Sequence, residues 1–114
     1  MKTIFIDIDG TLFAQPQNPL WANTLEAKLL PGVIKQFTDW NWKGYKIILT
    51  TGRKESTREL TVAQLKSHGI FYDLLIMGLD VGGERIIIND KKDGKDTCRA
   101  INVTRDSGLE DINI

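Results

Sequence analysis

Cysteine and histidine are nearly absent from this chain of 114 residues, which contains one of each. A single cysteine, Cys98, excludes an internal disulfide and a zinc site built from cysteines. Neither sign of charge predominates, because 15 basic residues balance 15 acidic ones, so net charge favours neither nucleic acid nor an anionic membrane as a partner. Long apolar runs are also lacking. Asp7 and Asp9 interrupt the N-terminal run too early for a signal peptide or a membrane span, and we expect a cytoplasmic protein.

The composition that remains, 41% hydrophobic and 26% charged, is typical of one globular domain, and we assign residues 1–114 to it. Apolar runs rich in β-branched residues alternate with segments of helical periodicity, which predicts a three-layer α/β/α fold around a parallel sheet of about five strands. The expected strands are Thr3–Ile8, Tyr45–Thr50, Leu74–Met77, Ile86–Asn89 and Ala100–Val103. The expected helices are Pro31–Lys43 and Ser56–Gly69, the second opened by a capping box of Ser56 and Glu59.

Acidic residues follow two of the predicted strands. Asp7 and Asp9 project to the same side of an extended chain, and their repulsion is relieved if they share a cation. Asp90 follows another apolar run and can complete the shell of a hard divalent ion, for which Mg²⁺ is the simplest candidate. The alternative is that Asp7 and Asp9 cap a turn and Asp90 is a solvated loop residue.

A second group of residues predicts an anion site. Thr51 and Gly52 lie between a strand and a helix N-terminus, where a hydroxyl and backbone N–H groups converge on a phosphate. Arg53 follows them. Contact with a substrate anion is one role for it, but a charge at the start of a helix is usually solvated, and we expect that here. The only histidine, His68, is expected to be solvated at the end of the same helix, with no catalytic role.

These motifs resemble those of the haloacid dehalogenase superfamily of aspartate-dependent phosphohydrolases. Asp-Ile-Asp-Gly-Thr at 7–11 is similar to the first motif, Ile47–Arg53 to the second and Ile86–Asp90 to the fourth. The resemblance implies a Rossmann-like fold, with Asp7 as the nucleophile and Asp9 as the general acid and base. It also implies that Mg²⁺ is held by Asp7, the Asp9 carbonyl and Asp90. Thr51 would bind the phosphoryl group, with Thr50 as the alternative.

The third motif of that family, a lysine or arginine before the fourth strand, has no obvious match. Arg85 is of the right type, but at the beginning of a parallel strand we expect it at the opposite end of the sheet from the site. Lys91 follows the strand, and we prefer it as the residue that contacts the phosphate. Because the chain leaves room for a loop, Phe13–Leu30, but not for a cap domain, we expect an open site.

The predicted function is hydrolysis of a small phosphate ester, a sugar phosphate by preference, with a homo-oligomer as one way to cover the open site. The resemblance extends weakly to small phosphatases of polysaccharide biosynthesis. Two other classes stay open: a receiver-like phosphoacceptor domain, and a binding module of the same fold that has lost catalysis. The receiver-like domain needs an aspartate ending the third strand, which this sequence lacks.

Overall fold

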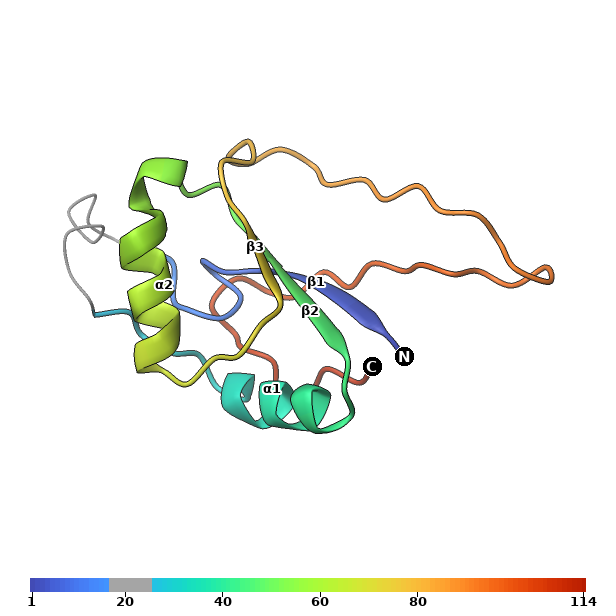
Figure 1. Ribbon diagram of the computed structural model, residues 1–114, viewed down its shortest axis with the longest axis horizontal. Coiled ribbons are helices and arrows are strands. Elements are labelled where there is room, and N and C mark those ends of the chain that lie inside the picture. The colour runs from blue at the N-terminus through green and yellow to red at the C-terminus, as the bar shows by residue number, and fades with distance from the viewer. Residues whose placement is uncertain (17–25) are drawn as a thin grey trace.

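The computed structural model describes residues 1–16 and 26–114. At its centre is a parallel sheet of three strands in the order β1-β2-β3, as Figure 1 shows. The strands are β1 (Thr3–Asp7), β2 (Lys46–Thr50) and β3 (Leu74–Ile76). The α/β class, the parallel sheet and the first three predicted strands are therefore confirmed.

Two helices accompany the sheet, α1 (Val33–Trp42) and α2 (Arg58–Ser67), and both lie within the ranges that the sequence predicts. Neither of these helices is long and apolar enough to cross a membrane, and no other helix in the described ranges is either. Gly32 precedes α1 in a left-handed conformation, with a φ of 79°. Glycine is the residue that adopts this conformation at least cost, so it sets the direction from which the chain enters α1.

The predicted capping box at the start of α2 is wrong. A short 3₁₀ turn, η2 (Glu55–Thr57), precedes the helix, and Thr57 occupies the cap position without a side-chain capping bond. Ser56 lies inside this tighter turn, so its hydroxyl is not the cap of α2. The Thr57 hydroxyl instead donates to the Lys54 carbonyl, 2.7 Å away, which closes the turn.

The hydrophobic core lies on one face of the sheet. Alternate strand residues such as Ile4 and Leu49 are buried in one cluster with Phe37 and Trp40 of α1 and Leu65 of α2. On the other face Phe5 is 52% exposed and Leu74 is 49% exposed. The described residues therefore form a sheet covered on one face, and the second helical layer that the sequence predicts is not among them.

The two remaining predicted strands, Ile86–Asn89 and Ala100–Val103, are wrong. Residues 80–102 form an extended arm that leaves the body of the molecule, turns, and comes back (Figure 1). Every residue of the arm is exposed, and the turn at its end is closed by a bridge between Lys92 and Lys95. The apolar runs correctly indicate extended backbone, but a strand also requires a hydrogen-bonded neighbour, and neither run has one within residues 1–16 and 26–114.

After the arm, the C-terminal segment is attached to the body. The Asp106 N–H donates to the Gly10 carbonyl at 2.9 Å, and the Leu109 N–H donates to the Pro31 carbonyl at 2.8 Å. The Gln36 side-chain amide of α1 also donates to the Leu109 carbonyl, at 2.9 Å. Both ends of the arm are therefore fixed to the same folded body.

Candidate active site

Asp7 and Asp9 lie together at the carboxyl end of β1. Asp7 is the last residue of the strand and faces Thr50 of β2 in register. Burial raises the pKa of Asp7 above its usual 3.8, and the negative charge of Asp9 raises it further. A hydrogen bond from the backbone of Ile8, the positive charge of Arg85 and the Thr11 hydroxyl oppose this change. The prediction that the two acids share one small volume agrees with this interaction.

Gly10 forms the turn that follows the two acids. Its φ is +86°, and its N–H donates to the Phe13 carbonyl at 2.7 Å. A side chain here would be strained by the backbone conformation and would stand 3.1 Å from the Arg105 side chain. The glycine therefore allows the chain to turn sharply while the C-terminal segment packs close to it.

Arg53 holds the Asp9 carboxylate with two hydrogen bonds. Its Nε and one Nη donate to the two carboxylate oxygens, each at 2.8 Å, and the other Nη donates to Thr61 and Gln64 of α2 at 3.0 and 2.6 Å. The Arg53 side chain is only 3% exposed. The expectation that Arg53 is solvated is therefore wrong. Thr61 and Gln64 are buried and lie three residues apart on the same face of α2. Two polar side chains on a buried helix face need a buried hydrogen-bonding partner, and this was the signal for Arg53 in the sequence.

Thr50, Thr51 and Gly52 follow one another beside Asp7. The Thr51 hydroxyl is buried and accepts a hydrogen bond from the Arg53 N–H at 3.0 Å, which leaves its proton for another acceptor. The Thr50 hydroxyl lies 3.5 Å from the Ile6 carbonyl. At Gly52 a Cβ would stand 3.2 Å from the Leu79 carbonyl oxygen, so the loop after β3 packs closely over this turn.

Asp90 and Lys91 lie in the arm, where both are exposed. Lys91 pairs with Asp96 at 3.5 Å, on the other limb of the arm. The structure does not bring Asp90 to Asp7 and Asp9, and residues 1–16 and 26–114 contain no group of three acidic, histidine or cysteine side chains that could hold a metal. The reason is that the run carrying Asp90 is not paired with the sheet.

Arg85 is the residue of the arm whose positive charge affects Asp7. Its charge lowers the pKa of Asp7, whereas Lys91, which the sequence favours, is paired within the arm. The expectation that Arg85 lies at the opposite end of the sheet assumed a strand that has not formed. Sequence patterning could not reveal this, because it indicates which residues are extended and not where an unpaired segment goes.

A pocket of about 360 Å³ opens beside Asp9, and Asp7 is not among the residues that line it. Asp9 and Arg53 line one side of it, and Lys28 and Asp106 are among the other described residues that line it. The mixture of acidic and basic groups around an open pocket can bind a small polar ligand.

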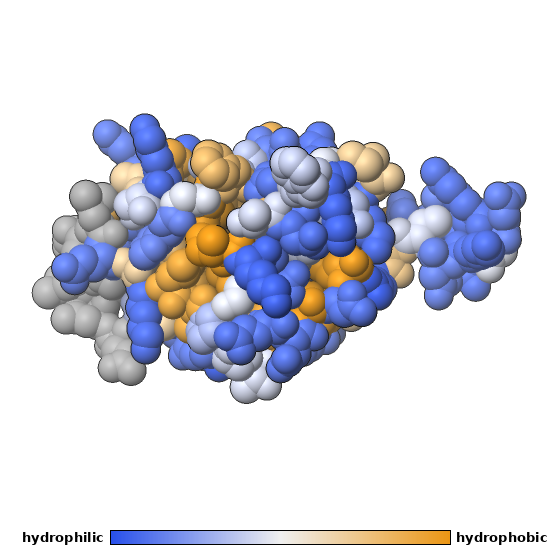
Figure 2. All heavy atoms as spheres, turned by 90° about the horizontal axis from the view of Figure 1, so that it is seen from below, coloured by the Kyte–Doolittle hydropathy of each residue, from blue (hydrophilic) through white to orange (hydrophobic). Residues whose placement is uncertain are grey.

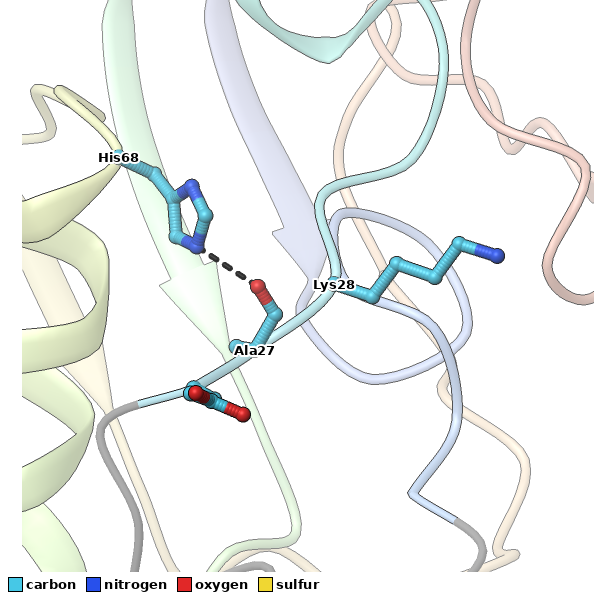
Figure 3. Close-up of a pocket in the computed structure, with 4 residues that line it drawn as sticks. Ala27, Lys28 and His68 are labelled. Carbon is cyan, nitrogen blue, oxygen red and sulfur yellow. Dashed lines mark hydrogen bonds between the residues drawn. The ribbon is translucent and has the colours of Figure 1, made fainter.

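A neighbouring pocket, shown in Figure 3, lies between His68 and residues 26–28. The His68 Nε2 is 2.7 Å from the Ala27 carbonyl oxygen, while the Lys28 side chain points away from the imidazole (Figure 3). The His68 ring also packs against Phe13, with 5.3 Å between ring centres. The expectation of a solvated histidine is therefore wrong, and His68 fixes the segment that forms one wall of the site.

Comparisons with known proteins give a family match. A family model described as HAD superfamily, subfamily IIIB (acid phosphatase), matches residues 1–102. The comparison with curated proteins finds no match.

Solved structures provide further similarities. Two structures of a Pnkp1/Rnl/Hen1 complex, the second described as an RNA repair complex, contain a chain that is 31% and 35% identical, with a TM-score of 0.60 in both. Each match covers 74% of this chain but only 30% and 27% of that one, so this chain spans less than a third of its length. A structure from Vibrio cholerae is 22% identical over 78% of this chain and 80% of its own, with a TM-score of 0.58, and is similar in fold.

Proposed function

The chain belongs to the HAD superfamily, subfamily IIIB (acid phosphatase), and from this we propose that it is a Mg²⁺-dependent phosphomonoesterase acting on a small phosphorylated metabolite, by preference a sugar phosphate. The observation that carries the proposal is the pair of acids at the end of β1, of which Asp7 is partly buried and Asp9 is held by Arg53 and lines an open pocket. A cytoplasmic location is part of the same proposal.

In the first step, a carboxylate oxygen of Asp7 attacks the substrate phosphorus, and the bond from phosphorus to the ester oxygen breaks. Asp9 gives its proton to the departing oxygen, so the alcohol leaves neutral. In the second step, Asp9 takes a proton from water, and the hydroxide attacks the phosphorus of the aspartyl phosphate. Inorganic phosphate leaves, and the Asp7 carboxylate is restored.

The Arg53 hydrogen bonds are compatible with this exchange of protons. Each carboxylate oxygen of Asp9 has two lone pairs and accepts one of these two hydrogen bonds from Arg53. One lone pair on each oxygen therefore remains for a proton. The arginine fixes the direction in which the carboxylate points, and the angle to a bound ester depends on that direction.

Binding of the phosphoryl group is assigned to Thr51, to the backbone N–H of Gly52 and to Arg85. The Thr51 hydroxyl is already an acceptor to Arg53, so it is oriented to donate its proton. The charge of Arg85 acts on Asp7 and would offset the negative charge of the phosphate there. Thr50 and Lys91 are the alternatives that the sequence offers for these two roles.

Mg²⁺ is the cofactor we propose, and it would supply charge neutralisation between the Asp7 carboxylate and the phosphate. The described residues fit it incompletely, because the third acid, Asp90, is in the exposed arm and is not grouped with Asp7 and Asp9. No step above depends on the metal.

The size and openness of the pocket support a small ester, since about 360 Å³ is within the range of small-molecule sites. A second candidate is the phosphate at the end of a polynucleotide. It is favoured by the 31% and 35% identity to a chain of the Pnkp1/Rnl/Hen1 complex, and an open site can admit a chain end.

The test is release of inorganic phosphate from p-nitrophenyl phosphate, from a panel of sugar phosphates and from oligoribonucleotides with a terminal phosphate, with and without Mg²⁺. We expect Mg²⁺-dependent turnover by the wild type and none by Asp7→Asn. Asp39→Asn is the matched control, because Asp39 is an exposed acid of α1 that pairs with Lys43. Its activity should equal that of the wild type.

Other outcomes identify the alternative classes. Stable phosphorylation by acetyl phosphate without turnover would indicate a receiver-like phosphoacceptor. Mg²⁺ binding, measured by calorimetry, without turnover or phosphorylation would indicate a non-catalytic module. Either result would refute the proposed phosphatase.

A further inference from the structure

The pocket of about 360 Å³ contacts one of the two acids at the end of β1 and not the other. Asp9 lines it and Asp7 does not. In the mechanism proposed above, the attacking Asp7 oxygen and the departing ester oxygen lie on opposite sides of the phosphorus, roughly in line. Asp9 must come within hydrogen-bond distance of the departing oxygen to give it a proton. The pocket is therefore on the side towards which the leaving group of the ester extends.

Three hydrogen bonds fix the walls of this pocket to the turn that carries Asp9. The Ala14 N–H donates to the Lys28 carbonyl at 2.8 Å, and the Asp106 N–H donates at 2.9 Å to the carbonyl of the glycine after Asp9. The Gln15 N–H donates to the Asp106 Oδ1 at 2.7 Å. The backbone positions of Lys28 and Asp106 relative to the turn are thus set before a ligand binds, as a selective pocket requires.

Asp106 has one carboxylate oxygen left for a ligand. Its Oδ1 accepts the bond from Gln15, and within the part of the chain that the structure describes no donor reaches its Oδ2. The φ of Asp106 is +65°, a left-handed conformation that costs energy for a residue other than glycine, although aspartate tolerates it better than most. Backbone strain of this kind is concentrated where a side chain is presented to a ligand.

Lys28 is a cation of the pocket without a counter-charge. Its side chain points away from the His68 imidazole (Figure 3), and no carboxylate of residues 1–16 or 26–114 pairs with it. The other cation among the described lining residues is Arg53, which already donates to both oxygens of Asp9. The arm adds no further cation, because none of the described lining residues belongs to it and its far end stands clear of the body (Figure 2).

The charges around the pocket leave an excess of one negative charge. The described lining residues include three acids and two bases, which are Asp9, Glu26, Asp106, Arg53 and Lys28. Residues 17–25, which lie outside the described ranges, contain no charged residue. A second phosphate on the leaving group would therefore enter a volume of like charge, which is unfavourable. A hydroxyl brings no charge, and it can donate to a carboxylate and accept from an ammonium at the same time.

We propose that this pocket binds the leaving group of the ester, and that Lys28 and Asp106 select an uncharged leaving group with several hydroxyls, as in a polyol or sugar monophosphate. The inference rests on the proposed function, because that function places the leaving group relative to Asp9. The Asp106 Oδ2 accepts a hydrogen bond from one hydroxyl, and the Lys28 ammonium donates to the oxygen of another. Leaving groups that carry further phosphates, such as those of bisphosphates and of polynucleotide ends, bind less well.

The test compares kcat/KM for glycerol phosphate and propyl phosphate, whose leaving groups have the same carbon chain and differ in their hydroxyls. We expect the wild type to prefer glycerol phosphate. Lys28→Met and Asp106→Asn should each reduce this preference about tenfold, the usual effect of losing one hydrogen bond to a charged group. Asparagine keeps an oxygen for the Gln15 N–H and tolerates the same φ, so circular dichroism should show an intact fold.

Comparison of variants with the wild type removes the difference in intrinsic reactivity between the two esters. The matched controls are Lys35→Met and Asp39→Asn, which replace exposed residues of α1 outside the pocket. Their preference for glycerol phosphate should equal that of the wild type. If Lys28→Met and Asp106→Asn behave like these controls, the assignment of the two residues is overturned.

The charge argument has a test of its own. The wild type should have a higher kcat/KM for a hexose monophosphate than for the corresponding hexose bisphosphate or for an oligoribonucleotide with a terminal phosphate. A preference for either of the two more highly charged substrates would overturn the proposal, because it would show that the pocket attracts further negative charge.

A measurement without turnover separates this inference from the proposed function. Saturation-transfer NMR of glycerol phosphate with Asp7→Asn should show contact between the protein and the hydroxyl-bearing carbons, and the double variant Asp7→Asn, Asp106→Asn should lose it. Turnover by a wild type whose preference no pocket variant alters overturns the selection and leaves the phosphatase intact. Absence of turnover together with a contact that Asp106→Asn removes refutes the phosphatase and supports the pocket. Absence of both refutes both.

Discussion

Replacing Arg53 with methionine should strongly destabilise the fold, although the replacement keeps much of the buried volume. The side chain is 3% exposed and its partner Asp9 is 17% exposed, so removal of the guanidinium leaves a carboxylate largely cut off from water and without this counter-charge. Thr61 and Gln64 lose the same donor. The expected destabilisation comes mainly from the unpaired acid, and less from the attraction that is lost.

The magnitude follows from general experience with buried ion pairs. Removing one partner of such a pair costs about 3–5 kcal/mol. Because water reaches Asp9, we expect a loss of about 3 kcal/mol for Arg53→Met. With a urea m-value of about 2 kcal/mol/M, the midpoint of unfolding should fall by roughly 1.5 M. Asp9→Asn in the Arg53→Met background should recover part of the loss, because the unpaired charge is then gone.

The measurement is urea unfolding followed by tryptophan fluorescence. The matched control is Lys43→Met, which breaks the exposed pair with Asp39 and should leave the midpoint unchanged within error. The experimental error of such midpoints is roughly 0.3 M. If the Arg53→Met midpoint lies within that error of the wild-type midpoint, water solvates Asp9 in the variant. The account of a buried, structural arginine would then be wrong.

Two further predictions concern a core residue and pH. Trp40 is 2% exposed and Trp42 is 90% exposed. Trp40→Ala should therefore lower the free energy of unfolding by about 3–5 kcal/mol, while Trp42→Ala should leave it nearly unchanged. Equal urea midpoints for the two variants would contradict the packing of α1. Burial raises the pKa of Asp7 in the folded chain above 3.8, so between 3.8 and the raised value the folded chain keeps a proton that the unfolded chain has lost. The free energy of unfolding therefore falls as pH rises through that window and stays lower above it. Asp7→Asn should unfold at higher urea than the wild type at pH 7, and a difference that persists unchanged well below pH 3.8 would argue against this cause.

The sequence was a good guide to the elements that pack against one another. The apolar run at Thr3–Ile8 predicted β1 almost to its ends, and the periodicity of Val33, Phe37 and Trp40 predicted α1 and its buried face. In these elements the secondary structure that the local sequence favours is the one that packing against the rest of the fold also favours. Composition and spacing alone were then enough to place them.

The same reasoning failed where a residue's environment is set by distant segments. Ile86–Asn89 has the composition of a strand, but pairing depends on whether another strand is beside it, and no local pattern contains that information. Arg53 appeared to be one of many charges at a helix start, and only the fold brings it to Asp9, 44 residues earlier. The family motifs predict roles for Asp7 and Asp9 that stay predictions, while the contact of Arg53 with Asp9 had to be found in three dimensions.

The hydrogen bonds of Arg53 have a consequence for communication within the domain. They connect the Asp9 carboxylate to Thr61 and Gln64, so the orientation of the acid is set before any ligand arrives and depends on where α2 lies. In the proposed mechanism, a small displacement of that helix would rotate the acid away from the ester oxygen while leaving Asp7 and Thr51 in place. If Asp9 transfers the proton as proposed, the outer surface of α2 is a place from which the rate of that transfer can be changed at a distance.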